Sequence, residues 1–315
     1  MREMPSKRSS LLIISLTCGV VILLFYNFDK SHSLVIDSIL GFGHVPLFCV
    51  VTAMILWIID WKNWPVSTTR NYILAGVISG ALAVLTEALQ QLTPERSFQI
   101  GDIIHDLMGS TIFILIAYQY KRKLKRKVLL SMNIMVAALL LFASLPVLAT
   151  VLDELRSKSD FPLLASFEMK GEMKRWKIDE INDRSHLHAT QGKHSLRIEL
   201  TPGLYPGASF NHPPRDWRGY DTLKFDAFLE GEYPLSLTVR INDLRHNEES
   251  SDRYNRTFTL RPGPNHVAIS LSEVEHAPKG RLMDMEHIAV LCIFSYKLKE
   301  PRTVYFDNFR LEKNG

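Results

Sequence analysis

The sequence predicts a bundle of membrane-spanning α-helices followed by an all-β sandwich. Two observations predict this division. Long apolar runs dominate the chain up to about residue 155, whereas short alternating runs broken by Pro and Gly fill residues 163–315. The hydrophobic content of 46% is therefore an average over two unlike halves. Three cysteines, Cys18, Cys49 and Cys292, lie too far apart for a disulfide framework or a metal-binding spacing.

Five segments are long and apolar enough, or nearly so, to span a membrane as helices of about 20 residues. They are residues 11–28, 40–59, 72–92, 103–120 and 128–152. The first precedes no small-residue cleavage site, so we interpret it as an uncleaved anchor and not as a signal peptide. Together the five spans form a transmembrane domain over residues 1–155, which a linker over residues 156–162 separates from the sandwich domain.

Lys and Arg are concentrated in alternate loops, and this asymmetry predicts the orientation of the chain. The densest basic run is residues 121–127, whereas the loops on the opposite side carry only Lys30 and Arg96. The positive-inside rule then places the N-terminus in the cytoplasm, and five spans place the sandwich outside it. We expect a multi-pass protein of the bacterial cytoplasmic membrane, with the lipid bilayer as a partner. Nucleic acid is not expected, because the basic run lacks aromatic platforms.

The orientation is testable with topology reporters. A reporter fused after Gly315 should behave as extracytoplasmic, and one inserted within residues 121–127 should behave as cytoplasmic, because basic loops stay inside. Reporter activities with the two locations exchanged would contradict both the orientation and an external sandwich.

Two carboxylates lie at membrane depth. Glu87 follows the apolar core of the third span, and Asp106 lies inside the start of the fourth. A carboxylate there costs at least a few kcal/mol, so it usually faces the bundle interior and has a function. Helical spacing places Gln90 on the same face as Glu87, and Asp102 on the same face as Asp106. A short turn between the spans would bring these groups to one membrane face.

His44 and Arg96 complete the predicted site. Arg96 is the only strong cation between the two acidic faces. It is expected either to be their counter-ion or to bind a phosphate or another anion beside a helix N-terminus. His44 is either a structural polar contact or an acid–base group. We expect a pocket near the outer membrane face where five candidate catalytic residues converge: His44, Glu87, Arg96, Asp102 and Asp106.

The spacing of these residues resembles that of the VanZ-like membrane proteins. The matching pattern is Glu87-x-x-Gln90-x-x-x-Pro94-x-Arg96-Ser97-Phe98, followed by Asp102, Asp106 and Gly109. The segment from Asp37 to His44 resembles the family's Asp–His element with a longer gap, and Asp106 replaces the family's Asn. The resemblance covers residues 29–120. It implies an association with glycopeptide-antibiotic tolerance and envelope polysaccharide loci, and it leaves the molecular activity open.

The second half alternates with a period of two, as half-buried strands do. The clearest run is residues 235–242, and residues 194–200, 223–228 and 303–306 continue the pattern. Pro and Gly turn markers separate these runs. Many short strands at such spacing predict an antiparallel sandwich of the jelly-roll type.

Both ends of this half resemble carbohydrate-binding modules with a galactose-binding-like sandwich. Ser166-Phe167-Glu168 is similar to their first strand, and residues 305–311 are similar to their last. The resemblance implies a structural Ca²⁺ bound by Glu168 and Asp307, because calcium prefers oxygen ligands. The alternative is that both are solvated acids at strand edges.

Sugar binding uses exposed aromatic rings and a few directed polar groups. The candidate ligand-binding residues of the sandwich are Tyr205, Trp217 and Tyr254, with Asp243 and His246 as polar partners and Arg253 and Asn255 nearby. For Trp217 the strand-entry motif around it favours a core position over an exposed platform, since aromatic side chains bury large areas. In the membrane half, Gln90 and Arg96 are the candidate ligand-binding residues.

The preferred hypothesis is a bacterial envelope protein that binds or handles a glycan, polymeric or lipid-linked, in surface polysaccharide assembly or antibiotic protection. One alternative is a membrane enzyme acting on a lipid-phosphate headgroup, with Arg96 as anion clamp and Glu87 or His44 as base. Another is a non-catalytic sensor or protein-binding scaffold. Substituting Glu87 or Arg96 separates these, because an enzyme would lose turnover while keeping glycan binding.

Overall fold

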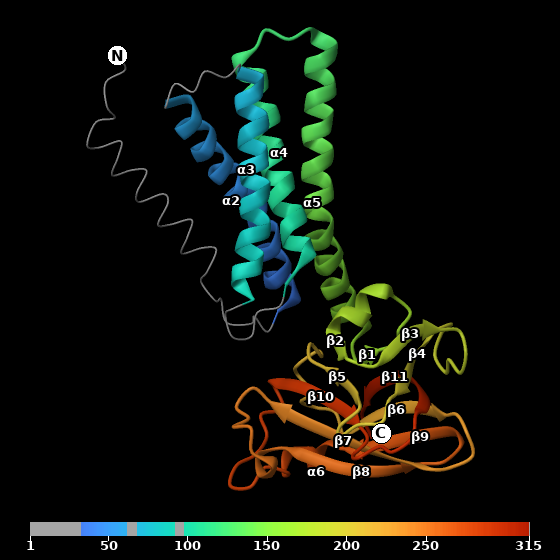
Figure 1. Ribbon diagram of the computed structural model, residues 1–315. Coiled ribbons are helices and arrows are strands. Elements are labelled where there is room, and N and C mark those ends of the chain that lie inside the picture. Colours follow the sequence, from blue (N-terminus) through green and yellow to red (C-terminus); the bar gives the residue numbers. More distant parts are fainter. Residues whose placement is uncertain (1–32, 62–67, 92–97, 315) are drawn as a thin grey trace. The chain divides into compact units, whose positions relative to one another are not determined.

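The computed structural model describes residues 33–61, 68–91 and 98–314 (Figure 1). The predicted first span, residues 11–28, and Arg96 lie outside the described residues. The chain divides into two compact units, Met1–Leu148 and Ala149–Gly315.

The described part of the first unit is helical. Its helices are α2 (Leu34–Trp61), α3 (Thr68–Gln90), α4 (Ile100–Lys121) and α5 (Arg126–Asp160), the last of which continues into the second unit. All four are long and apolar enough to cross a membrane. The expectation of a helical region with several candidate spans is confirmed, whereas the fifth span stays a prediction.

Helix α5 runs beyond the predicted span and through most of the predicted linker at residues 156–162. Apolar character ends near Leu152, but residues 153–160 contain neither Pro nor Gly, and two ion pairs at i, i+4 support another two turns. Arg156 pairs with Asp160 and Lys158 pairs with Glu154. The helix ends before Pro162, since the residue that precedes a proline disfavours helical geometry.

Helices α2 and α4 approach closely at Gly109. A methyl group added there would overlap the Val45 carbonyl oxygen, so only glycine fits without a shift. The Cys49 thiol donates to the Gly109 carbonyl oxygen (3.1 Å) across the same contact. The α2–α3 contact includes a hydrogen bond between the Thr52 and Ser79 hydroxyls (2.9 Å).

The second unit is a sandwich of two antiparallel sheets (Figure 1). Sheet A has the order β3-β4-β11-β6-β9, with β1 also paired to β11, and sheet B has the order β2-β5-β10-β7-β8. The strands of sheet A are β1 (Leu163–Ala165), β3 (Ile181–Ser185), β4 (Ser195–Leu200), β6 (Thr222–Leu229), β9 (Gly263–Ser270) and β11 (Arg302–Glu312). Those of sheet B are β2 (Trp176–Ile178), β5 (Gly207–Phe210), β7 (Leu235–Asp243), β8 (Tyr254–Leu260) and β10 (Ile288–Phe294). Short helices are η1 (Lys170–Arg175), η2 (Ser250–Asp252) and α6 (Leu271–Glu275).

One apolar core fills the space between the sheets. Along β7, Leu237, Val239 and Ile241 are buried while Ser236 is exposed, which confirms the predicted alternation and the antiparallel sandwich. Aromatic rings dominate one end of the core, where Trp176 stacks on Phe210 with ring centroids 4.5 Å apart.

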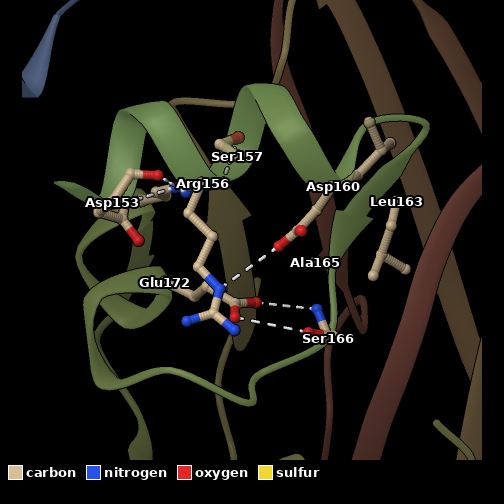
Figure 2. A pocket seen from close by; sticks show the side chains of 10 residues that line it. Asp153, Arg156, Ser157, Asp160, Leu163, Ala165, Ser166 and Glu172 are labelled. Carbon is tan, nitrogen blue, oxygen red and sulfur yellow. Dashed lines mark hydrogen bonds and ion pairs between the residues drawn. The ribbon is translucent and has the colours of Figure 1, made fainter. Parts of the chain in front are cut away.

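The last turns of α5 belong to the second unit because a buried arginine holds them there. Arg175, at the end of η1, donates from Nε to Asp153 Oδ2 (2.8 Å) and from Nη1 to Ser157 Oγ (2.7 Å). Beside it, Glu172 Oε2 accepts the backbone N–H groups of Ser166 and Phe167, both at 2.8 Å. Figure 2 shows the small pocket that these segments line. The unit boundary therefore lies within α5 and before the expected linker.

Removing the arginine should destabilise the sandwich. In a fragment of residues 149–315, Arg175→Met should lower the free energy of unfolding by about 3 kcal/mol, because Asp153, whose side chain is only 11% exposed, would remain unpaired. Urea denaturation followed by tryptophan fluorescence measures the change.

The matched control is Arg218→Met, whose exposed pairs with Asp216 and Glu286 should contribute no more than about 1 kcal/mol. A fragment that begins at residue 161 lacks the partners of Arg175 and should also be destabilised. Equal stability of the two variants would show that the buried contact does not hold the helix end.

Candidate functional site

In the helical first unit, which we call the membrane unit for its four candidate spans, the structure brings together three of the predicted site residues. His44 Nδ1 on α2 lies 2.9 Å from Asp106 Oδ1 on α4, and His44 Nε2 lies 3.9 Å from Asp102 Oδ2. Asp102 and Asp106 share one face of α4, as their spacing predicts. The contact depends on the close approach of α2 and α4 at Gly109.

Glu87 is buried near the C-terminal end of α3, and its Oε1 accepts the Gln99 backbone N–H (2.6 Å) immediately before α4. It also lies close enough to His44 and Asp106 to interact electrostatically with both. Gln90 is buried one turn further along α3. Buried charged and polar groups need partners, and these contacts supply them. The contacts do not indicate which reaction, if any, the residues carry out. Convergence on Arg96 stays a prediction.

Two of the aromatic candidates in the sandwich are core residues. Trp217 is fully buried and donates from Nε1 to the Pro214 carbonyl oxygen (2.7 Å), and Tyr254 is also buried. The burial of Trp217 agrees with the core position that its strand-entry motif favours, whereas the burial of Tyr254 contradicts a role as a sugar platform. The physical reason is the large apolar area of each ring, which the sandwich removes from water.

Asp243 and His246 both take part in a hydrogen-bond network inside the sandwich. Arg281 donates to both oxygens of Asp243 and to both oxygens of Asp252. His246 is buried and hydrogen-bonded through Nδ1 to the Asp252 carbonyl oxygen (2.9 Å). The Arg281 guanidinium lowers the pKa of Asp252 to about 2, so this network stays charged at neutral pH. The carboxylates and the guanidinium of this network are occupied by one another, whereas His246 Nε2 is buried without a hydrogen-bond partner among the described residues.

Tyr205 is exposed and has two aromatic neighbours that sequence analysis missed. Its ring centroid lies 5.7 Å from that of Phe294 and 5.4 Å from that of Tyr296. Tyr205 is 61% exposed and Tyr296 is 53% exposed. We call these three residues the aromatic ledge. The alternation Phe294-Ser295-Tyr296 at the end of β10 was the available signal, because the buried Ile293 turns Phe294 to the outer side.

The ledge adjoins a polar surface, the outer face of sheet B. Across this face Ser209, Cys292, Arg240 and Asn255 stand in register on four neighbouring strands. Two residues away on β7 and β8, and on the same face, the Thr238 and Thr257 hydroxyls are hydrogen-bonded to each other at 2.9 Å. Exposed rings beside directed hydroxyl, amide and guanidinium groups are the combination that saccharide sites use.

The outer face of sheet A carries a separate cavity of about 210 Å³. Its polar groups are bonded to one another, since Asp226 accepts from the Thr190 hydroxyl (2.7 Å) and lies 2.6 Å from His266 Nδ1. His188 stacks on Phe228 at its rim. Sequence analysis did not predict this cavity.

The proposed calcium ligands hold the loop between β3 and β4 by hydrogen bonds. Glu168 Oε1 accepts the backbone N–H groups of Lys193 and His194, both at 2.7 Å. Asp307 Oδ2 accepts those of Thr190 (2.7 Å) and Gln191 (2.8 Å). Calcium requires six to eight oxygen ligands, whereas N–H donors occupy these carboxylates. Among the described residues no group of three or more His, Cys, Asp or Glu is placed to hold a metal ion. The residues as placed do not fit calcium.

The buried Asp307 should give the sandwich a distinctive pH dependence. Burial raises the pKa of Asp307 to about 6, so between about pH 4 and 6 the native state keeps a proton that the unfolded chain releases. This group therefore stabilises the fold below pH 4, and the contribution is lost as pH rises through 6. At about 1.4 kcal/mol per pKa unit, the loss is on the order of 2–3 kcal/mol. Asp307→Asn should abolish it in the 149–315 fragment.

The measurement is the difference in unfolding free energy between wild type and variant across this range, with the exposed Asp216→Asn as control. A difference curve is needed because Glu168 acts in the opposite sense. Although burial alone would raise its pKa, backbone N–H donors leave that pKa below the usual range. Its stabilisation is consequently lost as pH falls. Excess calcium should leave the melting temperature of the fragment unchanged. A calcium-dependent rise that Asp307→Asn removes would show that Asp307 binds calcium after all.

No protein-family model matches the chain, and no curated protein matches it. Solved structures are similar to about half of it. An exo-beta-agarase is 15% identical (TM-score 0.41) over 49% of this chain, which spans 25% of the agarase. A family 11 carbohydrate-binding module from Clostridium thermocellum, in complex with a beta-1,3-1,4-mixed-linked tetrasaccharide, is 16% identical (TM-score 0.37) over 48% of this chain and 94% of the module. The CBM22-1 xylan-binding domain from Paenibacillus barcinonensis Xyn10C is 17% identical (TM-score 0.33) over 50% of this chain and 97% of the domain.

Proposed function

We propose that this chain is a membrane-anchored glycan-binding protein of the bacterial envelope, with its sandwich outside the cytoplasmic membrane. The observation that carries the proposal is the aromatic ledge beside the polar outer face of sheet B. The four candidate spans and the distribution of Lys and Arg support the membrane location and its orientation.

The ledge supports saccharide binding on physical grounds. Sugar rings have apolar C–H faces that pack against aromatic rings, and their hydroxyls require directed hydrogen-bonding partners. Tyr205 and Tyr296 are tilted by 33° relative to each other, which forms an extended shelf and leaves both rings open to solvent. Thr238, Thr257 and Asn255 offer hydroxyl and amide groups on the adjoining strands. An exposed aromatic group of this kind usually marks an interaction site.

The membrane unit is proposed to be VanZ-like. The resemblance rests on two separate elements, residues 37–44 and residues 87–109, and the contact between His44 and Asp106 joins them. On this proposal the unit anchors the sandwich and contributes to surface polysaccharide assembly or to protection against antibiotics. The glycan bound by the sandwich is polymeric or lipid-linked.

Loss of either ledge tyrosine should weaken glycan retention. Tyr205→Ala and Tyr296→Ala should each reduce affinity about tenfold, because a ring contact of about 1.4 kcal/mol is lost. Native affinity electrophoresis of the 149–315 fragment, in gels containing xylan, mixed-linked glucan, agarose or polygalacturonate, measures the change.

Phe228→Ala is the matched control, because it removes an aromatic ring from the cavity on sheet A. Retention lost only in that variant would move the site to sheet A. If the folded wild-type fragment binds none of a broad glycan panel, the proposed function is wrong.

A further inference from the structure

Two arginines lie next to each other on the outer face of sheet B. Arg240 is in β7, where its neighbours Val239 and Ile241 are buried, so its own side chain is on the outer side. Arg253 directly precedes Tyr254, which pairs with Ile241 and is buried with it, so Arg253 is also on the outer side. The two guanidinium groups interact electrostatically.

Among the described residues, neither arginine has a carboxylate within hydrogen-bonding distance. Arg253 forms no hydrogen bond or ion pair with any described residue, and its Nε is buried without a partner. Burial and the neighbouring Arg240 lower the pKa of Arg253. Among the described residues, the Arg240 guanidinium contacts Asn242 Oδ1 (3.2 Å) and, at 3.9 Å, the Glu248 carboxylate. Glu248 also acts electrostatically on Arg253, but its side chain is 86% exposed, so solvent screens its charge.

Two other arginines of the sandwich, one buried and one partly buried, are paired with carboxylates. Arg175 contacts Asp153, and Arg281 contacts both Asp243 and Asp252. A pair of half-buried like charges is unfavourable unless an anion lies between them. Arg240 and Arg253 are therefore arranged as one half of an anion-binding site.

The aromatic ledge indicates what kind of molecule carries the anion. Phe294 and Cys292 are two residues apart on β10, about 7 Å, and they pair with Thr238 and Arg240 of β7 respectively. A sugar ring on the ledge would thus place its substituents next to Arg240. Tyr205 also lies within electrostatic range of Arg253.

We propose that the outer face of sheet B recognises an anionic glycan, whose uronate carboxylate or sulfate ester lies between Arg240 and Arg253 while its sugar ring packs on the aromatic ledge. This inference rests on the proposed function and specifies its ligand class. A guanidinium binds a carboxylate or sulfate through two parallel hydrogen bonds, so two guanidiniums provide both charge and orientation. A neutral glycan would leave both arginines unpaired, and the site therefore discriminates against it.

The experiment compares ligands that differ only in charge. The full-length chain in detergent micelles is titrated calorimetrically with polygalacturonate and with its fully methyl-esterified form, and in a second arm with dextran sulfate and with dextran. At least one charged polymer should bind about tenfold more tightly than its neutral counterpart, with an affinity that falls as salt rises. The arm that shows the difference identifies carboxylate or sulfate as the anion.

Arg240→Gln and Arg253→Gln should each remove most of the preference for the charged polymer. Arg253→Lys should retain only part of it, because a lysine ammonium cannot form the two parallel hydrogen bonds of a guanidinium. Arg261→Gln is the control. It removes the same charge from an exposed position at the far end of β8, roughly 25 Å along the strand. It should leave the preference unchanged.

Two outcomes would overturn the inference alone, and a third would overturn the proposed function on which it rests. Charged and neutral polymers could bind equally while Tyr205→Ala still weakens both. The protein would then bind glycans without recognising an anionic group. Arg261→Gln could cost as much as Arg253→Gln, which would show unspecific attraction by net charge. Failure of both polymers in both arms, together with failure on the wider glycan panel, would instead overturn the proposed function itself. Circular dichroism of each variant shows whether it is folded.

Discussion

The pairing of buried charges is the constraint on which both units depend. In the membrane unit, Asp106 is buried among apolar helices because His44 meets it from the neighbouring helix. In the sandwich, Arg175 and Arg281 each satisfy carboxylates contributed by distant parts of the chain. A buried charge without its partner costs several kcal/mol, so these contacts specify which segments lie together. Arg253 departs from this rule, because its guanidinium has no hydrogen bond or ion pair among the described residues.

The two sheets divide structural and binding roles between them. Sheet A contains both ends of the sandwich, and its Asp307 and Asp226 hold loops and neighbouring side chains. Its carboxylates are occupied by backbone N–H groups and hydroxyls. Sheet B exposes hydroxyl, amide and guanidinium groups together with two solvent-facing tyrosines. The hydroxyls of sheet B are also hydrogen-bonded to neighbours, so the group there that is most available to a ligand is Arg253, which has no partner among the described residues.

Sequence patterns predicted the types of element well and their contacts less well. The alternation over residues 235–242 identified β7 almost to its ends, because apolar and polar residues alternate along a strand that has one buried and one exposed face. The same pattern could not show that the Asp243 carboxylate is paired with Arg281, 38 positions away. Hydropathy located the span of α5 but not its last two turns, which depend on ion pairs and on contacts with Arg175. Tyr205 was identified from its type alone, whereas its ledge partners required knowledge of cross-strand neighbours.

Strand β11 is the last strand in the chain, yet it lies between β4 and β6 and also pairs with β1. The pairing of β1, β4 and β6 within sheet A is therefore incomplete until residues 302–312 have been synthesised. During synthesis these strands present unpaired N–H and C=O edges, the kind of surface that recruits strands from other chains. The order of the strands thus makes the emerging sandwich vulnerable to aggregation until its final segment arrives, and contacts of such long sequence separation form slowly.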